Sequence, residues 1–181
     1  VAHSPYLLER MSSQAIVAAA FREAANGAGR IVLVSGEAGI GKTTLVETFL
    51  SAHRAEVRIL LGRCDALSTP EPLGPLYDIA HQAGGALRKL ITSPQERLAI
   101  FGALLNELTG ATPTVLVFED IHWADVATLD LLKYLGRRVR SVPALMILTY
   151  RDDEIDARHA LWSVLGNLPA EATRRVHLEP L

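Results

Sequence analysis

The sequence predicts an α/β fold in which a parallel sheet of five strands lies between two layers of helices. Short apolar runs alternate with longer stretches of helical periodicity, which is typical of βαβ units. The apolar runs show no polar alternation, as expected for strands that are covered on both faces. The chain has 181 residues, of which 49% are hydrophobic and 21% charged. This is the size and composition of one globular domain, so we expect residues 1–181 to fold together.

Five apolar runs are expected to be the strands, and each is four to seven residues long. Most consist of β-branched and aliphatic residues, which favour buried strands. The fifth run is the least apolar of them. The expected strands cover residues 31–35, 57–61, 114–118, 144–150 and 175–178.

Five helices are expected between or beside these strands, over residues 14–26, 42–53, 94–108, 126–138 and 157–165. The first ends at Asn26-Gly27, a pair that commonly terminates helices, and Asp125 is a suitable N-cap for the fourth. The third places Leu98, Phe101, Leu104, Leu105 and Leu108 on one stripe. Residues 68–75 contain three prolines and are expected to be irregular, because proline interrupts helices and central strands.

The strongest functional motif follows the first expected strand. Residues 36–44 match the phosphate-loop pattern G-x-x-x-x-G-K-[ST], and a helix is expected to begin at its end. Glycines permit the tight turn that brings backbone N–H groups to phosphate oxygens, and the helix N-terminus favours an anion. A glycine-rich turn that binds nothing is the competing interpretation, which the strand-and-helix context disfavours. The expected phosphate-binding residues are Gly36, Glu37, Ala38, Gly39, Ile40, Gly41, Lys42, Thr43 and Thr44.

Three side chains of this loop have distinct expected roles. The Lys42 ammonium would neutralise the β- and γ-phosphates, and the Thr43 hydroxyl would bind Mg²⁺. Thr44 is placed to reach the α-phosphate.

Two adjacent acids, Glu119 and Asp120, follow the third expected strand. Ligands of parallel α/β sheets gather at the carboxyl ends of strands. One carboxylate would hold Mg²⁺ through water, and the other would orient or deprotonate the attacking water. The residues leave open which acid has which role. A solvated acidic loop without function is the alternative.

Arg151 follows the fourth expected strand. If this strand lies beside the phosphate loop, the guanidinium faces the γ-phosphate. The alternative is an ion pair with Asp152, Asp153 or Glu154 in the same turn.

Several other residues have more ordinary interpretations. Packing is favoured over base stacking for Trp123, and a structural or exposed role over water orientation for His122. The single cysteine, Cys64, is interpreted as a packing residue. Arg137, Arg138 and Arg140 suit the C-terminal end of a helix, and an arginine finger directed at a neighbouring subunit is the less favoured interpretation.

The overall composition argues against several classes of function. The formal charge of −2 disfavours direct nucleic-acid binding by this segment, because phosphate backbones attract a basic surplus. No apolar run is long enough to cross a membrane, and the histidines show no zinc-site spacing. One cysteine suits a reducing compartment, so a cytoplasmic location is expected.

The segments GEAGIGKTTLVETF, VLVFEDIHWADVATLDLL and ILTYRDDE together resemble the STAND branch of AAA+-type P-loop ATPases. The sequence looks most like the N-terminal ATPase domain of large LuxR-family (LAL, MalT-like) transcriptional regulators, and HWAD is the most specific stretch. The resemblance implies a three-layer P-loop NTPase fold with strand order 5-1-4-3-2. Residues 36–44 would be the Walker A loop, Glu119-Asp120 the Walker B acids and Arg151 the sensor residue. Tyr6 to Arg10, including Leu8 and Arg10, would lie against adenine.

The resemblance also implies a function. We expect a regulatory domain that binds ATP or ADP with Mg²⁺, hydrolyses ATP slowly and acts as a switch in a signal-responsive transcriptional regulator. Its partners would be other domains of a longer chain, namely lid, winged-helix, sensor and helix-turn-helix domains. It would also form a nucleotide-dependent oligomer. The 181 residues do not include the lid domain of these relatives, so we expect them to bind nucleotide more weakly. The Glu-Asp pair departs from the Asp-Asp or Asp-Glu of many relatives. The alternatives are an interaction module that binds but does not hydrolyse nucleotide and, less favoured, a phosphotransferase with residues 68–75 as its lid.

Overall fold

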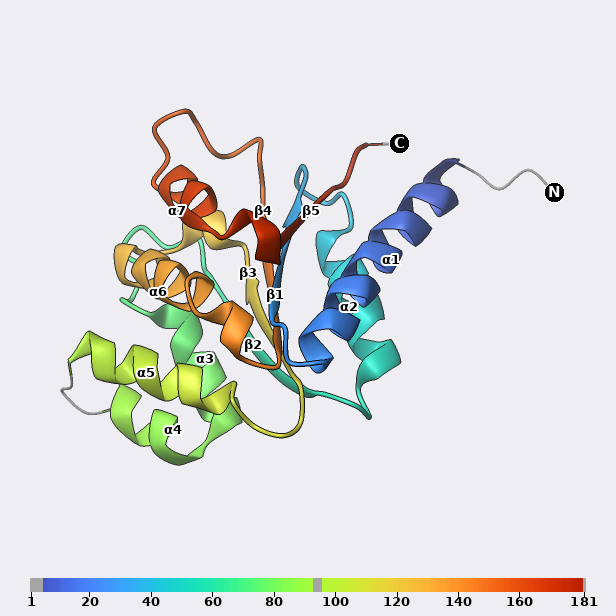
Figure 1. Cartoon of the computed structure of the whole chain (residues 1–181). Coiled ribbons are helices and arrows are strands. Elements are labelled where there is room, and N and C mark those ends of the chain that lie inside the picture. The colour runs from blue at the N-terminus through green and yellow to red at the C-terminus, as the bar shows by residue number, and fades with distance from the viewer. Residues whose placement is uncertain (1–4, 93–95, 181) are drawn as a thin grey trace.

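The five strands form one all-parallel sheet in the order β2-β3-β4-β1-β5. This order and the three-layer arrangement confirm the fold expected from the sequence (Figure 1). The structure is a computed structural model, and it describes residues 5–92 and 96–180. The strands are β1 (Arg30–Ser35), β2 (Arg58–Arg63), β3 (Thr114–Glu119), β4 (Ala144–Tyr150) and β5 (Thr173–His177).

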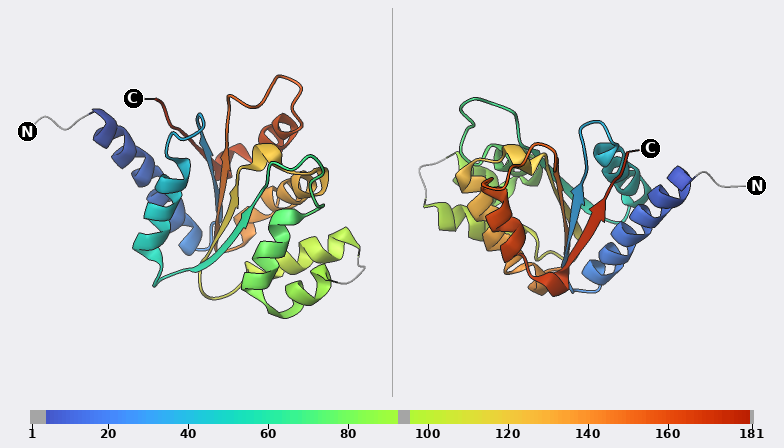
Figure 2. Two further views of the ribbon diagram at one scale, coloured as in Figure 1. Left: turned by 180° about the vertical axis from the view of Figure 1, so that it is seen from behind. Right: turned by 90° about the horizontal axis from the view of Figure 1, so that it is seen from above.

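Helices cover both faces of this sheet. The α-helices are α1 (Pro5–Ala25), α2 (Lys42–His53), α3 (Gly74–Ala83), α4 (Gly85–Ile91), α5 (Arg97–Glu107), α6 (Val126–Gly136) and α7 (Leu161–Asn167). Short 3₁₀ turns are η1 (Ile121–Trp123), η2 (Val139–Ser141) and η3 (Ala170–Ala172). Helices α1 and α2 lie on one face, and α3 to α7 lie on the other (Figures 1 and 2).

Successive side chains of each strand point to opposite faces of the sheet, so the hydrophobic core has two parts, one on each face. On β1, Val32 and Val34 pack toward α1 and α2, whereas Ile31 and Leu33 pack toward the opposite helices. Strands β3 and β4 are buried along their whole lengths, so they occupy the middle of the sheet as the apolar runs predicted.

Several helix boundaries differ from the prediction. Helix α1 begins at Pro5 rather than at residue 14, because proline is tolerated in a first turn and nothing from residue 6 to 13 interrupts a helix. Helix α7 begins at Leu161 rather than at residue 157, after a series of turns. Helix α5 begins at Arg97, and the first two residues of its predicted range, 94 and 95, lie outside the described residues.

The predicted inner stripe of α5 was wrong at one position. Leu98 is 66% exposed, whereas Ile100, Phe101 and Leu104 are buried. The buried face is thus centred on residues 100, 101 and 104, and Leu98 falls on the outer side.

Helices α3 and α4 were not predicted from the sequence. The prolines of residues 68–75 concealed the start of α3, although Pro75 lies in its first turn, where a missing N–H is harmless. The helix also packs very close to the sheet: a Cβ on Gly62 of β2 would lie 2.3 Å from the Pro75 carbonyl oxygen. Gly84 ends α3 and precedes α4.

The start of α6 is capped as predicted. The Asp125 carboxylate accepts the backbone N–H groups of Ala127 (2.8 Å) and Thr128 (3.0 Å), and its second oxygen accepts the Leu73 N–H (3.2 Å). One side chain therefore stabilises the helix and ties the preceding loop to it.

Replacing Asp125 with Ala is expected to lower the free energy of unfolding by about 1–2 kcal/mol, because three backbone donors lose their acceptor. Urea denaturation measures this change. Asp130→Ala is the matched control, since Asp130 is exposed on the same helix, and it should change stability much less. Equal losses in the two variants would contradict the capping role.

Candidate functional site

Parallel pairing brings the three predicted motifs to the same edge of the sheet. Strand β4 pairs with both β1 and β3, so the carboxyl ends of these three strands are neighbours. A cavity of about 210 Å³ lies there. It is lined by Gly39, Gly41, Lys42, Thr43, Thr44, Asp120 and Arg151. Residues that are more than 100 positions apart in the chain thus meet around one space.

The loop between β1 and α2 has the backbone conformation that its glycines permit. Gly36, Gly39 and Gly41 all have positive φ values, of 145°, 74° and 100°. At Gly36 a Cβ would also lie 2.6 Å from the Leu178 carbonyl oxygen. Substitution of Gly36 would therefore require a shift of the backbone next to β5.

The Lys42 ammonium lies across this loop. Its Nζ donates hydrogen bonds to the carbonyl oxygens of Gly36 and Glu37, both at 2.7 Å. The side chain is largely buried, and this burial lowers the pKa of Lys42, while the nearby Asp120 carboxylate opposes that effect. The structure therefore places a cation at the cavity and fixes it by two carbonyl groups.

The two predicted acids have different environments. Asp120 lines the cavity, has a left-handed backbone (φ 55°) and donates its N–H to Thr149 Oγ1 at 3.0 Å. Glu119 is 3% exposed and is bound by Arg63 of β2: Nε lies 2.8 Å and Nη2 2.5 Å from Glu119 Oε2. This carboxylate raises the pKa of Arg63.

Arg63 was missed as a site residue, although a cation at the carboxyl end of a strand could have been noticed in the sequence. Its pairing with Glu119 is a consequence of the β2–β3 register, in which the two residues are opposite each other. Register of this kind is a tertiary property that the sequence pattern does not specify.

Replacing Arg63 with Ala is expected to lower the free energy of unfolding by about 2 kcal/mol, because the buried Glu119 carboxylate would lose its partner. Chemical denaturation measures the loss. Arg140→Ala removes a guanidinium from the exposed pair with Glu171 and should change stability by less than about 1 kcal/mol. A loss at Arg63 no larger than at Arg140 would show that the Glu119 contact is dispensable.

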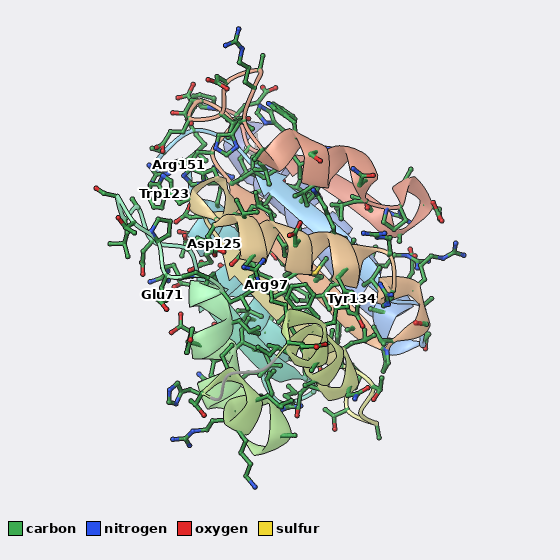
Figure 3. All side chains as sticks on the ribbon, turned by 90° about the vertical axis from the view of Figure 1, so that its left-hand side faces the viewer. Glu71, Arg97, Trp123, Asp125, Tyr134 and Arg151 are labelled. Atoms are coloured by element: carbon green, nitrogen blue, oxygen red, sulfur yellow. The ribbon has the colours of Figure 1, made fainter. Side chains whose placement is uncertain are left out.

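Arg151 makes the ion pair with Glu154 that was considered as the alternative for it, and its predicted contact with the γ-phosphate stays a prediction. The residue lines the cavity beside Lys42 and Asp120. Its Nη1 also donates to Glu154 Oε1, and its Cζ lies 4.7 Å from the centre of the Trp123 ring. Arg151 and Trp123 are labelled next to each other in Figure 3. The ion pair raises the pKa of Arg151 and lowers that of Glu154. Glu154 was considered only as an alternative ion-pair partner and was not identified as a site residue.

His122 and Trp123 pack together next to this pair, with ring centres 4.5 Å apart. The His122 side chain is buried, and burial lowers its pKa, so the imidazole is uncharged at neutral pH. The prediction of a structural role for His122 and of packing for Trp123 agrees with these contacts.

A second cavity, of about 620 Å³, lies between α1 and α2. It shares Gly41 and Thr44 with the smaller cavity, and most of its lining is apolar, including Met11, Leu45 and Phe49. The Arg10 guanidinium lies at the junction, where it donates to the Ile40 carbonyl oxygen. The Leu8 side chain, also expected near a ligand, lies outside the described residues.

The remaining candidates have local partners. Arg138 lies over the Tyr134 ring at 3.8 Å, and Arg140 pairs with Glu171 at 2.8 Å. Cys64 is buried, which raises the pKa of its thiol to about 12.

Within residues 5–92 and 96–180, no three His, Cys, Asp or Glu side chains gather as a metal site. No helix of that part is long and apolar enough to cross a membrane.

Comparisons with known proteins agree with this fold. The model of the AAA ATPase domain family matches residues 6–148. An uncharacterized protein of Rhizobium meliloti (strain 1021) is 26% identical over 196 residues, which include 82% of this chain. Cdc6p from Pyrobaculum aerophilum has a similar fold, with a TM-score of 0.62, 14% identity and 97% of this chain covered. A Walker-type ATPase of Pyrococcus abyssi follows, with a TM-score of 0.59, 13% identity and 95% covered.

The matched proteins are longer than this chain. The alignments cover 19% of the Rhizobium protein, 46% of the Cdc6p chain and 53% of the Pyrococcus chain.

Proposed function

Because the chain belongs to the family of AAA ATPase domains, we propose that it is an ATP-binding regulatory domain with slow Mg²⁺-dependent hydrolysis. The observation that carries this proposal is the cavity at the sheet edge, where the phosphate loop, Asp120 and Arg151 meet. Two cations, backbone donors of a helix N-terminus and one acid around one space suit a polyphosphate with a divalent metal.

The residues present fit a magnesium nucleotide. Thr43 and Asp120 supply hard oxygen atoms to the same cavity, and phosphate oxygens and water would complete the shell. When bound, Mg²⁺ neutralises phosphate charge. Lys42 would then contact the β- and γ-phosphates, after exchanging its hydrogen bonds to the Gly36 and Glu37 carbonyls for phosphate oxygens.

Asp120 is the acid that we assign to the reacting end of the site. It lines the cavity, whereas Glu119 is bound by Arg63 and is not among the lining residues. The Asp120 carboxylate would orient the attacking water or hold the metal, and the left-handed backbone at this position directs it from the end of β3. Glu119 would then support the loop through Arg63.

The larger cavity between α1 and α2 is proposed to receive the adenosine part of the nucleotide. It adjoins the smaller cavity at the sheet edge, here called the phosphate cavity, at Gly41 and Thr44. Its apolar lining suits a purine ring. Arg10 lies at the junction of the two cavities. Purine selectivity is thus proposed to depend on the contact between α1 and α2.

The regulatory role rests on the resemblance of the HWAD and RDDE stretches to the ATPase domains of LuxR-family regulators. We propose that the nucleotide state is passed to other domains of a longer chain, in the cytoplasm, and in a nucleotide-dependent oligomer. The charge of −2 favours those domains, rather than this one, as the DNA-binding part.

Titration calorimetry with ATP and Mg²⁺, combined with steady-state phosphate release, tests the proposal. Micromolar binding with slow release supports the switch. Binding without release, also in the full-length protein, supports the interaction module instead. Transfer of phosphate to a small molecule would support a phosphotransferase, and absence of ATP binding would refute all three.

A further inference from the structure

One carboxylate outside the proposed reacting groups accepts hydrogen bonds from two side chains and lies close to a third. Glu154 Oε1 accepts Arg151 Nη1, and Oε2 accepts the Trp123 indole N–H at 3.1 Å. His122 Nε2 is buried, makes no hydrogen bond within the described residues, and lies 3.4 Å from the same Oε2. These four residues form a cluster beside the phosphate cavity, to which Arg151 contributes directly.

The backbone of Arg151 orients the His122 ring. The backbone N–H of Arg151 points to His122 Nδ1 at 3.4 Å, so Nδ1 is the accepting nitrogen. The proton of the imidazole is then on Nε2, which faces Glu154. Arg151 is therefore held at both ends: by His122 at its backbone and by Glu154 at its guanidinium.

The cluster also connects two loops. His122 and Trp123 belong to η1, which follows Asp120 at the end of β3. Arg151 and Glu154 follow the end of β4. Both loops border the phosphate cavity. The cluster therefore fixes the distance between the Asp120 carboxylate and the Arg151 guanidinium, which line this cavity.

We propose that Glu154 is a positioning residue that holds the Arg151 guanidinium for the terminal phosphate of a nucleoside triphosphate. The residue thereby sets the preference of the site for triphosphate over diphosphate. This inference rests on the proposed function. Arginine has five N–H donors, so one can be bound by Glu154 while others remain for phosphate. A guanidinium fixed between a carboxylate and the Trp123 face loses less conformational entropy on binding.

The test compares the dissociation constants of Mg-ATP and Mg-ADP, measured by calorimetry on the full-length chain. In Glu154→Gln we expect the preference for ATP over ADP to fall roughly tenfold, with ADP affinity little changed. Glutamine has an NH₂ group in place of one carboxylate oxygen, so it cannot keep both the Arg151 and the Trp123 hydrogen bonds as Glu154 accepts them, one on each oxygen. Asp153→Asn is the matched control, because it removes the same charge from an exposed neighbour, and the preference should be unchanged.

A double variant separates positioning from general structural support. If Glu154 acts through Arg151, the Arg151→Ala and Glu154→Gln pair should lose no more ATP preference than Arg151→Ala alone. Trp123→Phe removes one donor to Glu154 and keeps an aromatic ring, so it should lose preference in the same direction but less. Trp123→Phe also provides the test if Glu154→Gln fails to fold, which thermal unfolding would reveal.

The failures of the two proposals are distinguishable. Lys42-dependent ATP binding with an unchanged ATP preference in both Glu154→Gln and Trp123→Phe would overturn only this inference. A higher ATP preference in Glu154→Gln would also overturn it, because Glu154 would then compete with phosphate for Arg151. A wild-type chain that binds neither nucleotide would overturn the proposed function and this inference together.

Discussion

ATP affinity is expected to fall roughly 100-fold or more in Lys42→Ala, which brings binding below detection by calorimetry. The ammonium is the largely buried cation of the phosphate loop, and among the described residues no other lysine lines the cavity. Its loss would remove the positive charge that is proposed to neutralise the β- and γ-phosphates. It also removes the two Lys42 hydrogen bonds to the Gly36 and Glu37 carbonyls, so the loop would be less ordered before binding.

The control for Lys42→Ala is Lys133→Ala, which removes an equal charge from α6 and should bind ATP like the wild type. Circular dichroism and thermal unfolding of both variants exclude loss of fold as the cause. Unchanged ATP affinity in folded Lys42→Ala would refute the assignment of the phosphate loop.

Steady-state phosphate release is expected to fall roughly 100-fold in Asp120→Asn, while ATP binding is retained. Asparagine is nearly the same size and tolerates the left-handed backbone at this position, where φ is 55°. The substitution therefore removes the charge that is proposed to orient water or hold the metal, without straining the loop. Alanine would combine both effects and is less informative.

Glu119→Gln is the companion variant. Because Glu119 is bound by Arg63 and is 3% exposed, its substitution should lower the free energy of unfolding more than Asp120→Asn does. Turnover at a temperature where the protein is folded should decrease less than in Asp120→Asn. A folded Glu119→Gln protein without turnover, beside an active Asp120→Asn protein, would reverse the assignment of the two acids.

Prediction was most successful where a local signal determined the structure. The run Ala144–Tyr150 is an uninterrupted apolar segment, and β4 has these bounds. Helix α2 begins at Lys42 and ends at His53 as predicted, because the phosphate loop defines its start and the apolar stripe its length. Asp125 caps α6 because a carboxylate at an N-cap needs only its own neighbouring N–H groups.

Prediction failed where distant segments decide. The start of α3 depends on the packing of Pro75 against Gly62, which a proline-rich stretch does not reveal. The outward position of Leu98 depends on which face of α5 meets the core. The sequence alone could not show which of the adjacent acids Glu119 and Asp120 has which role, because Arg63, the partner of Glu119, lies on another strand.

By itself, the sequence determined the fold class, the phosphate loop and the presence of acids and Arg151 at strand ends, because each depends on residues close together in the chain. Only the tertiary structure decided that Asp120 lines the cavity while Arg63 binds Glu119, and that Glu154, Trp123 and His122 gather around Arg151. The physical reason is that such contacts depend on strand register and loop placement. Both are set by burial over the whole chain rather than by any local segment.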